Sequence, residues 1–206
     1  MSSVWIVFAP LADGDEALVN AHWIAQQTAA LVPSPTATVM GTTATRAALE
    51  AAWMGCEAQV GLCLFGHGDA QAVYGADGEP AFDQDNACGQ WVHAFACRTG
   101  LRLAHTAAAR GVGCYLGYDT SLLVGWSMEA LPPPLRALLS ALVTAASDAM
   151  RQGVRSRRAL QRAVSSAADA LVDWINQHTP EEHLGLGVLA AMLVDRVVLV
   201  GPDAFP

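Results

Sequence analysis

Short apolar runs alternate along the chain with longer segments whose apolar residues recur at helical spacing. Short runs rich in β-branched and aromatic residues are typical of strands buried on both faces. They predict six strands, at Val4–Ala9, Ala37–Gly41, Gln59–Phe65, Trp91–Ala96, Gly113–Tyr118 and Val197–Gly201. The longer segments predict helices at 15–31, Thr43–Cys56, Thr99–Arg110, Leu131–Met150 and Gly153–His178.

Residues 69–90 break this alternation. They are rich in glycine and acidic residues, and the turn signal Ala76-Asp77-Gly78 stands between two short runs. Such a pattern predicts either a β-hairpin or an irregular loop.

Alternation of strands with helices favours right-handed crossovers and a mostly parallel sheet. The sequence therefore predicts a three-layer α/β sandwich, with a six-stranded sheet and helices on both faces. It contains no linker-like break and no internal repeat, so residues 1–206 are expected to form a single domain. In such sheets the ligand crevice lies beyond the carboxyl ends of the strands.

Composition excludes several classes of protein. Hydrophobic residues make up 53% of the chain, enough for a buried core, and the net charge of −8 argues against nucleic-acid binding. The longest apolar stretch, Leu184–Gly201, is interrupted by Asp195 and Arg196, so no membrane span is expected. Five cysteines without a CxxC pair fit neither a disulfide scaffold nor a zinc ribbon. We expect a cytoplasmic protein with reduced thiols and no metal or other cofactor.

His67 and Cys97 each stand just past the end of a predicted strand. A thiol becomes a usable nucleophile when a base removes its proton, and histidine can be that base near neutral pH. The helix predicted from Thr99 would place positive potential near the Cys97 sulfur. The backbone N–H groups of Gly68 and Cys97 could together form an oxyanion hole.

The segments around His67 and Cys97 resemble motifs of a known family. Leu64-Phe65-Gly66-His67-Gly68 resembles the strand–His-Gly motif of caspase-like cysteine peptidases, and Phe95-Ala96-Cys97-Arg98-Thr99-Gly100 resembles their strand–Ala-Cys-Arg-Gly motif. Segments 111–118 and 198–203 are similar to later strands of bacterial relatives of the gingipain, clostripain and CHAT kind. The resemblance implies a Cys-His dyad that cleaves protein or peptide substrates without a metal. It also implies an effector that an activating partner or ligand regulates.

The chain departs from the animal caspases in three ways. Phe95 occupies the position of a Gln in the caspase motif, and Thr99 is inserted between Arg98 and Gly100. The interval from His67 to Cys97 is 30 residues, against roughly 50 in caspases. These departures argue against cleavage after aspartate.

In the family, residues after the first and fifth strands shape the first specificity pocket. Asp13, Asp15 and Asp119 occupy those places here. Because a buried carboxylate pairs well with Arg or Lys, the resemblance predicts substrate binding by these residues and cleavage after a basic residue.

Other residues are interpreted as structural. Cys88 is the rival nucleophile, but no strand–helix turn surrounds it, and His93 is expected to be a core histidine. The acidic residues of segment 69–90 do not follow the EF-hand spacing, so a solvated loop is favoured over a calcium site. The arginine-rich segment Arg151–Arg158 is interpreted as a solvated helix start, and the alternative is a self-processing site.

Two other functions stay open. The first is a catalytically inactive caspase-like module that acts in binding or as a scaffold. The second is a flavodoxin-like or nucleotide-binding domain, although the acidic segment 9–15 after the first strand is a poor phosphate cradle.

Overall fold

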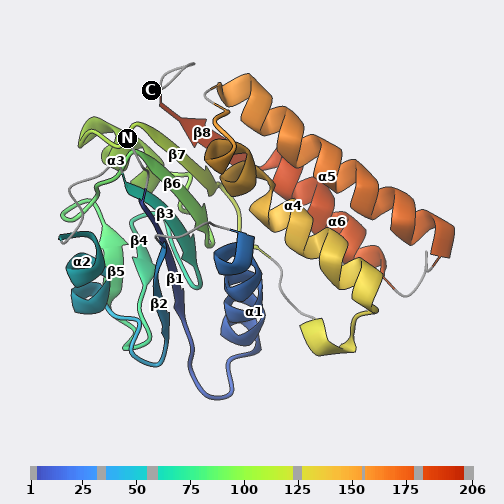
Figure 1. The fold of residues 1–206 in the computed structure, drawn as a ribbon, viewed down its shortest axis with the longest axis horizontal. Coiled ribbons are helices and arrows are strands. Elements are labelled where there is room, and N and C mark those ends of the chain that lie inside the picture. Colours follow the sequence, from blue (N-terminus) through green and yellow to red (C-terminus); the bar gives the residue numbers. More distant parts are fainter. Residues whose placement is uncertain are drawn as a thin grey trace.

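The computed structural model of the chain describes residues 4–31, 36–54, 60–122, 127–154, 156–178 and 183–201. Its central sheet contains six strands in the order β2-β1-β3-β6-β7-β8 (Figure 1). Their bounds are β1 Val4–Pro10, β2 Thr36–Gly41, β3 Val60–Phe65, β6 Trp91–Phe95, β7 Cys114–Tyr118 and β8 Val197–Val200. All neighbouring pairs are parallel except β7 and β8, which are antiparallel. The predicted six-stranded, mostly parallel sheet is confirmed.

Successive strand residues face opposite sides of the sheet, so each central strand contributes to two cores. In β1, Val7 joins the core on one face and Phe8 joins the core on the other. Leu116 and Tyr115 of β7 divide in the same way. Burial on both faces explains why the sequence shows continuous apolar runs at these strands instead of alternation.

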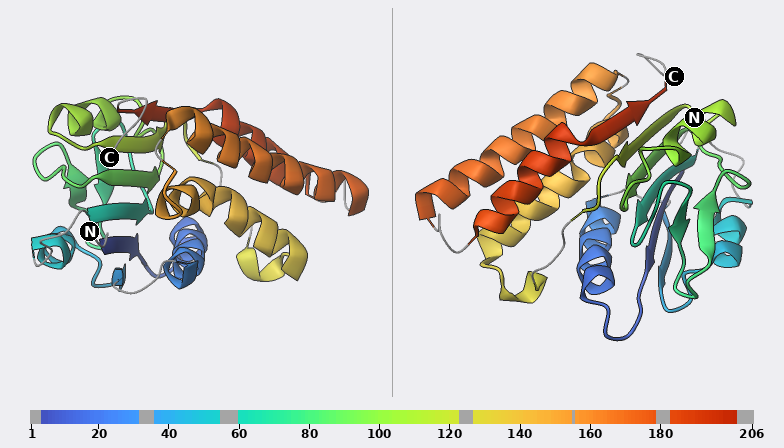
Figure 2. Two further views of the ribbon diagram at one scale, coloured as in Figure 1. Left: turned by 45° about the horizontal axis from the view of Figure 1, so that its top comes forward. Right: turned by 180° about the vertical axis from the view of Figure 1, so that it is seen from behind.

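Helices cover both faces of the sheet, as predicted. On one face lie α1 (Glu16–Leu31) and α4 (Pro133–Arg151), and α4 packs in turn on α5 (Arg157–His178), which packs on α6 (Leu184–Asp195). These last three helices extend well beyond the sheet, as Figure 2 shows. A short 3₁₀ helix, η1 (Met128–Ala130), precedes α4.

The opposite face is covered by smaller elements. They are α2 (Arg46–Met54), α3 (Leu103–Ala109) and a hairpin of β4 (Ala72–Tyr74) and β5 (Pro80–Asp83). The hairpin falls within segment 69–90 and so confirms the first of the two structures predicted there.

Two elements differ from the expectation. Helix α3 begins at Leu103 instead of Thr99, because residues 97–102 form turns in which Arg98 and Gly100 donate their backbone N–H groups to Thr120 and to Tyr118 at the end of β7. The helix N-terminus therefore does not follow Cys97 directly. Helix α6 was not predicted, since its apolar residues leave no polar stripe to reveal a helical period.

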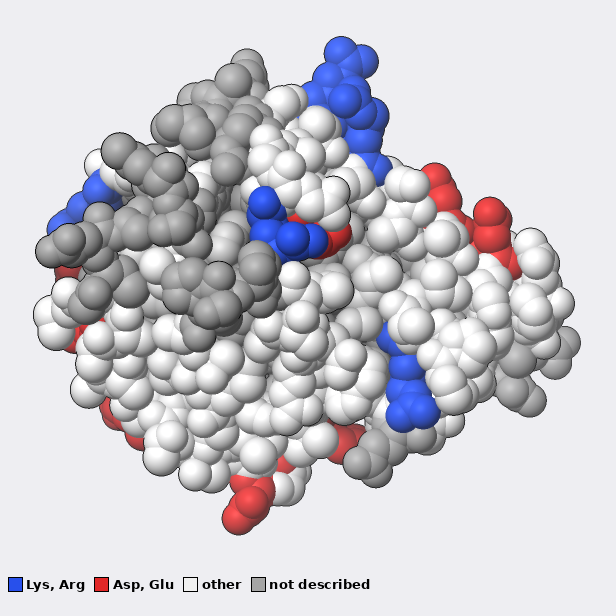
Figure 3. Space-filling model, in the orientation of Figure 1, with Lys and Arg blue, Asp and Glu red and all other residues white. Residues whose placement is uncertain are grey.

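Within the described ranges, no helix combines the length and the apolar character needed to cross a bilayer. On the face drawn in Figure 3, basic side chains form small, separate groups instead of one continuous basic surface.

Candidate active site

The register of two neighbouring strands brings His67 and Cys97 to the same edge of the sheet. Strands β3 and β6 are parallel neighbours, and Phe65 is paired with Phe95 at their ends. His67 and Cys97 each follow two residues after that pair. Both side chains line one cavity of about 120 Å³. The ends of these two strands are therefore adjacent in the sheet.

The turn that carries Cys97 is held by the end of β7 and the loop that follows it. Arg98 donates its backbone N–H to Thr120 O at 2.9 Å, and Gly100 donates to Tyr118 O at 2.8 Å. Arg98 itself has a φ of +57°, in the left-handed region that non-glycine residues rarely adopt. Such strain is commonly found beside functional residues and persists only where surrounding bonds enforce it.

The sulfur of Cys97 has a backbone partner. Leu122 donates its N–H to Cys97 Sγ at 3.2 Å. In the same arrangement the thiol can donate toward Leu122 O, 3.9 Å away. These contacts hold the sulfur against the loop after β7. Leu122 was not among the residues singled out from the sequence, because only tertiary folding brings it to Cys97.

His67 is held by a carboxylate at the start of α1. Its Nε2 donates to Asp15 Oδ2 at 2.7 Å, and the His67 side chain is 51% exposed. Because a carboxylate can only accept, Nε2 carries the hydrogen and Nδ1 is left as the nitrogen that can take a proton. No hydrogen bond joins His67 directly to Cys97 in this part of the structure, and such bonds are often absent until substrate binds.

Asp15 also caps helix α1. Its Oδ1 accepts the N–H of Leu18 at 3.1 Å. Burial alone would raise the pKa of Asp15, but hydrogen bonds from His67 and from the N–H groups of Leu18 and Ala17 lower it overall. The carboxylate is therefore ionised at neutral pH and fixed from two sides.

Gly68 packs where no side chain fits. A Cβ at this position would lie 2.9 Å from Ala96 Cβ and 3.0 Å from Thr99 Cγ2. The absence of a side chain lets the His67 turn and the Cys97 turn approach each other closely. Neither the Gly68 N–H nor the Cys97 N–H donates a hydrogen bond to any residue within the described ranges. Both predicted oxyanion donors are thus uncommitted there.

The three predicted substrate-binding carboxylates lie in different surroundings. Asp13 is exposed in the turn before α1, Asp15 is bonded to His67, and Asp119 pairs with Arg196 at 2.8 Å. None of the three lines the cavity beside Cys97. The structure brings Asp15 to the histidine and does not gather the three into one pocket.

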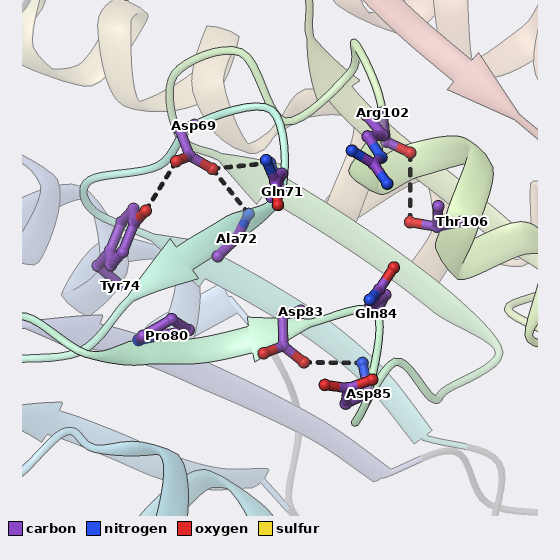
Figure 4. A pocket seen from close by; sticks show the side chains of 10 residues that line it. All are labelled: Asp69, Gln71, Ala72, Tyr74, Pro80, Asp83, Gln84, Asp85, Arg102 and Thr106. Carbon is purple, nitrogen blue, oxygen red and sulfur yellow. Dashed lines mark hydrogen bonds between the residues drawn. The ribbon is translucent and has the colours of Figure 1, made fainter.

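A second, polar cavity of about 430 Å³ lies between the β4–β5 hairpin and the start of α3. In Figure 4, Arg102 and Thr106 lie across this cavity from Pro80 and Asp83. Asp69 lies on its wall and shapes the turn after His67, since it accepts hydrogen bonds from the Tyr74 hydroxyl and from two backbone N–H groups. Burial alone would raise the pKa of Asp69, but these bonds lower it.

The other cysteines are poor nucleophiles in their surroundings. Burial raises the pKa of Cys63 to about 12 and that of Cys114 to about 11. Half-burial, together with the nearby Glu50 carboxylate, raises the pKa of Cys88 to about 11. Cys56 lies outside the described residues.

The acidic residues of segment 69–90 do not gather into a cation site. No group of three His, Cys, Asp or Glu side chains that could hold a metal ion is found in the described part of the chain. Asp83 instead pairs with Arg46 at 2.9 Å.

The chain folds as an α/β sandwich around a mostly parallel six-stranded sheet, with His67 and Cys97 on one cavity at the strand ends. The chain matches the crystal structure of the Arg-specific cysteine proteinase gingipain R with a TM-score of 0.53 and 11% identity. The match covers 98% of this chain and 46% of that one, so this chain spans about half the length of that protein. At such identity the likeness establishes a shared fold alone. No family model matches the chain, and no curated protein matches it significantly.

Proposed function

We propose that this chain is a cysteine peptidase in which Cys97 is the nucleophile and His67 the general base. The observation that carries the proposal is the register of β3 and β6, which places both side chains on one cavity. The shared fold with a cysteine proteinase supports the reaction class.

The first half of the reaction forms a thioester. His67 Nδ1 takes the proton of Cys97, and the thiolate attacks the carbonyl carbon of the scissile bond. The N–H groups of Gly68 and Cys97 would receive the negative oxygen of the tetrahedral intermediate. When the C–N bond breaks, His67 returns its proton to the leaving amine.

The second half releases the acyl group. Water loses a proton to His67 and attacks the thioester, and the intermediate collapses to a carboxylic acid and the Cys97 thiol. Asp15 would keep the His67 ring in one orientation and stabilise the imidazolium that forms in each half.

The direct test is cleavage of denatured protein, with new termini identified by mass spectrometry, in wild type and Cys97→Ser. The proposal expects new termini with the wild type and none with the variant. Equal cleavage by both proteins would overturn it.

A non-catalytic binding module is the second candidate. The observation in its favour is that His67 is bonded to Asp15 and Cys97 to Leu122, with no bond between them. It predicts full partner binding by Cys97→Ala. An enzyme awaiting an activating partner would instead gain turnover when that partner is added, and the intact dyad would be required.

Specificity is a separate question. Cleavage after a basic residue stays a prediction from the family resemblance. It needs a carboxylate beside the substrate, whereas none of Asp13, Asp15 and Asp119 lines the cavity beside Cys97. The lining and volume of the cavity beside Cys97 favour a different kind of residue before the scissile bond.

A further inference from the structure

The cavity beside Cys97 has mainly apolar walls. Helix α1 contributes Ala17 and Ala21, β6 contributes Phe95, and the loop after β7 contributes Leu122. The rest of the wall comes from the two strand ends, with Gly66, His67, Ala96 and Cys97. Phe95 stands two residues before the nucleophile, and both side chains pack in the core on the α1 and α4 side of the sheet.

The size of this cavity limits what can enter it. Its volume is about 120 Å³, slightly less than that of the roughly 150 Å³ protein cavities that take up benzene. A side chain of about one to four carbons fits that space. The two alanines of α1 set the limit, because every larger residue at either position would fill part of the cavity.

The cavity also lies where the side chain before the scissile bond must go. The attacked carbonyl carbon has to approach Cys97 Sγ while its oxygen faces the N–H groups of Gly68 and Cys97. The Cα of the residue before the bond is attached directly to that carbon. Its side chain therefore starts next to the sulfur, at the mouth of this cavity.

The charges around the cavity disfavour a cationic side chain. None of the described residues that line it is a carboxylate. Asp15 is bonded to His67, and Asp119 is paired with Arg196. A guanidinium or ammonium group placed there would lose its hydration without a fixed counter-charge, which is costly.

We propose that the residue before the scissile bond is small and apolar, from alanine to leucine in size, and that Ala17, Ala21, Phe95 and Leu122 form its binding pocket. The proposal rests on the proposed function, because a specificity pocket needs an enzyme. It names the class of substrate residue that the same site would accept. That residue is apolar, whereas the family resemblance predicts a basic one.

The test uses one peptide series that differs only in the residue before a fluorogenic amide: Gly, Ala, Val, Leu, Phe, Arg and Asp. One methylene too many or too few in an apolar pocket changes kcat/KM about 10- to 200-fold. We expect Ala, Val or Leu to exceed Phe, Arg and Asp by at least about 10-fold. A preference for Arg or Asp would overturn the inference.

Two substitutions should move the preference in opposite directions. Ala17 is half-buried and lines the cavity, so Ala17→Leu fills it and should lower the Val-to-Gly ratio of kcat/KM about 10-fold or more. Leu122→Ala enlarges the cavity and keeps the backbone bond to the sulfur, so it should raise the Phe-to-Ala ratio by a similar factor. Ala30→Val, exposed on the same helix, is the control that leaves both ratios unchanged.

The two proposals fail in distinguishable ways. Cys97-dependent cleavage with unchanged ratios in both cavity variants would overturn the apolar pocket and leave the peptidase intact. If no peptide is cleaved and Cys97 is not labelled by an alanyl chloromethyl ketone, the peptidase proposal falls and the pocket with it. Circular dichroism confirms that each variant is folded.

Discussion

Two histidine–cysteine pairs in the described part of the chain differ in almost every physical respect. His67 and Cys97 lie past the strand ends, on an open cavity beside Asp15. His93 and Cys63 lie inside the sheet on paired positions of β6 and β3. Ser147 of α4 connects His93 and Cys63, the inner pair, with its Oγ 2.7 Å from His93 Nδ1 and 3.4 Å from Cys63 Sγ.

Burial decides which pair can do chemistry. It lowers the pKa of His93 to about 4 and raises the pKa of Cys63 to about 12, so both inner groups stay neutral. The inner pair therefore acts as a polar anchor between the sheet and α4. His67 and Cys97, the outer pair, keep contact with solvent and with the Asp15 carboxylate, which are the conditions a general base needs.

The largest expected effect is a loss of activity, and it should follow mutation of the outer pair alone. Cys97→Ala or His67→Ala should reduce kcat/KM by about 1,000-fold or more, because each removes a group that acts on the reacting atoms. The measurement is hydrolysis of the best peptide from the fluorogenic series.

Cys63→Ala is the matched control for this experiment. It should leave kcat/KM unchanged and cost about 1 kcal/mol of unfolding free energy, for the lost packing of one buried sulfur. If Cys63→Ala abolished turnover in a folded protein while Cys97→Ala did not, the assignment of the two pairs would be reversed.

The next effect is a pH dependence of stability from His93. Between its folded pKa of about 4 and its ordinary value of about 6.5, the unfolded chain binds a proton that the folded chain does not. The free energy of unfolding should therefore fall as pH drops through this range, by on the order of 3 kcal/mol for this one group.

Urea unfolding of wild type and His93→Gln between pH 4 and 7 measures this contribution. The difference in stability between the two proteins should narrow as pH falls, because the variant lacks the titrating group. A difference that stays constant over the range would show that His93 is not the buried neutral histidine described here.

A smaller effect concerns the carboxylate that distinguishes the outer pair. Asp15→Asn should lower kcat/KM about 10- to 100-fold, because the amide no longer stabilises the His67 imidazolium. Asparagine caps helices as well as aspartate does, so α1 should persist. Asp13→Asn, two residues earlier and exposed, should change nothing. Equal activity of all three proteins would remove Asp15 from the mechanism.

The smallest effect tests the strain beside the nucleophile. Among the described residues, Arg98 is the one non-glycine residue with a positive φ. Arg98→Gly should raise the free energy of unfolding by about 0.5–1 kcal/mol, since glycine adopts this conformation without a Cβ clash. Arg98→Ala keeps the Cβ, so it should not raise the free energy of unfolding. Thermal unfolding of the two variants decides between these results.

The sheet could be predicted because every central strand is buried on both faces and appears as an apolar run. The positions of His67 and Cys97 at two strand ends were visible for the same reason. The bond from Leu122 to Cys97 could not be predicted, because it joins loops 25 residues apart. Asp15 was singled out, but its bond to His67 depends on how α1 packs against the sheet, and local sequence does not encode that.

Covalent labelling of the native protein with an alanyl chloromethyl ketone, followed by intact-mass analysis and peptide mapping, tests directly whether Cys97 is the nucleophile. We expect one adduct, on Cys97, which forms more slowly in His67→Ala and is absent in Cys97→Ala. Labelling of Cys88 or Cys63 in place of Cys97, or at equal rates in wild type and His67→Ala, would contradict this assignment.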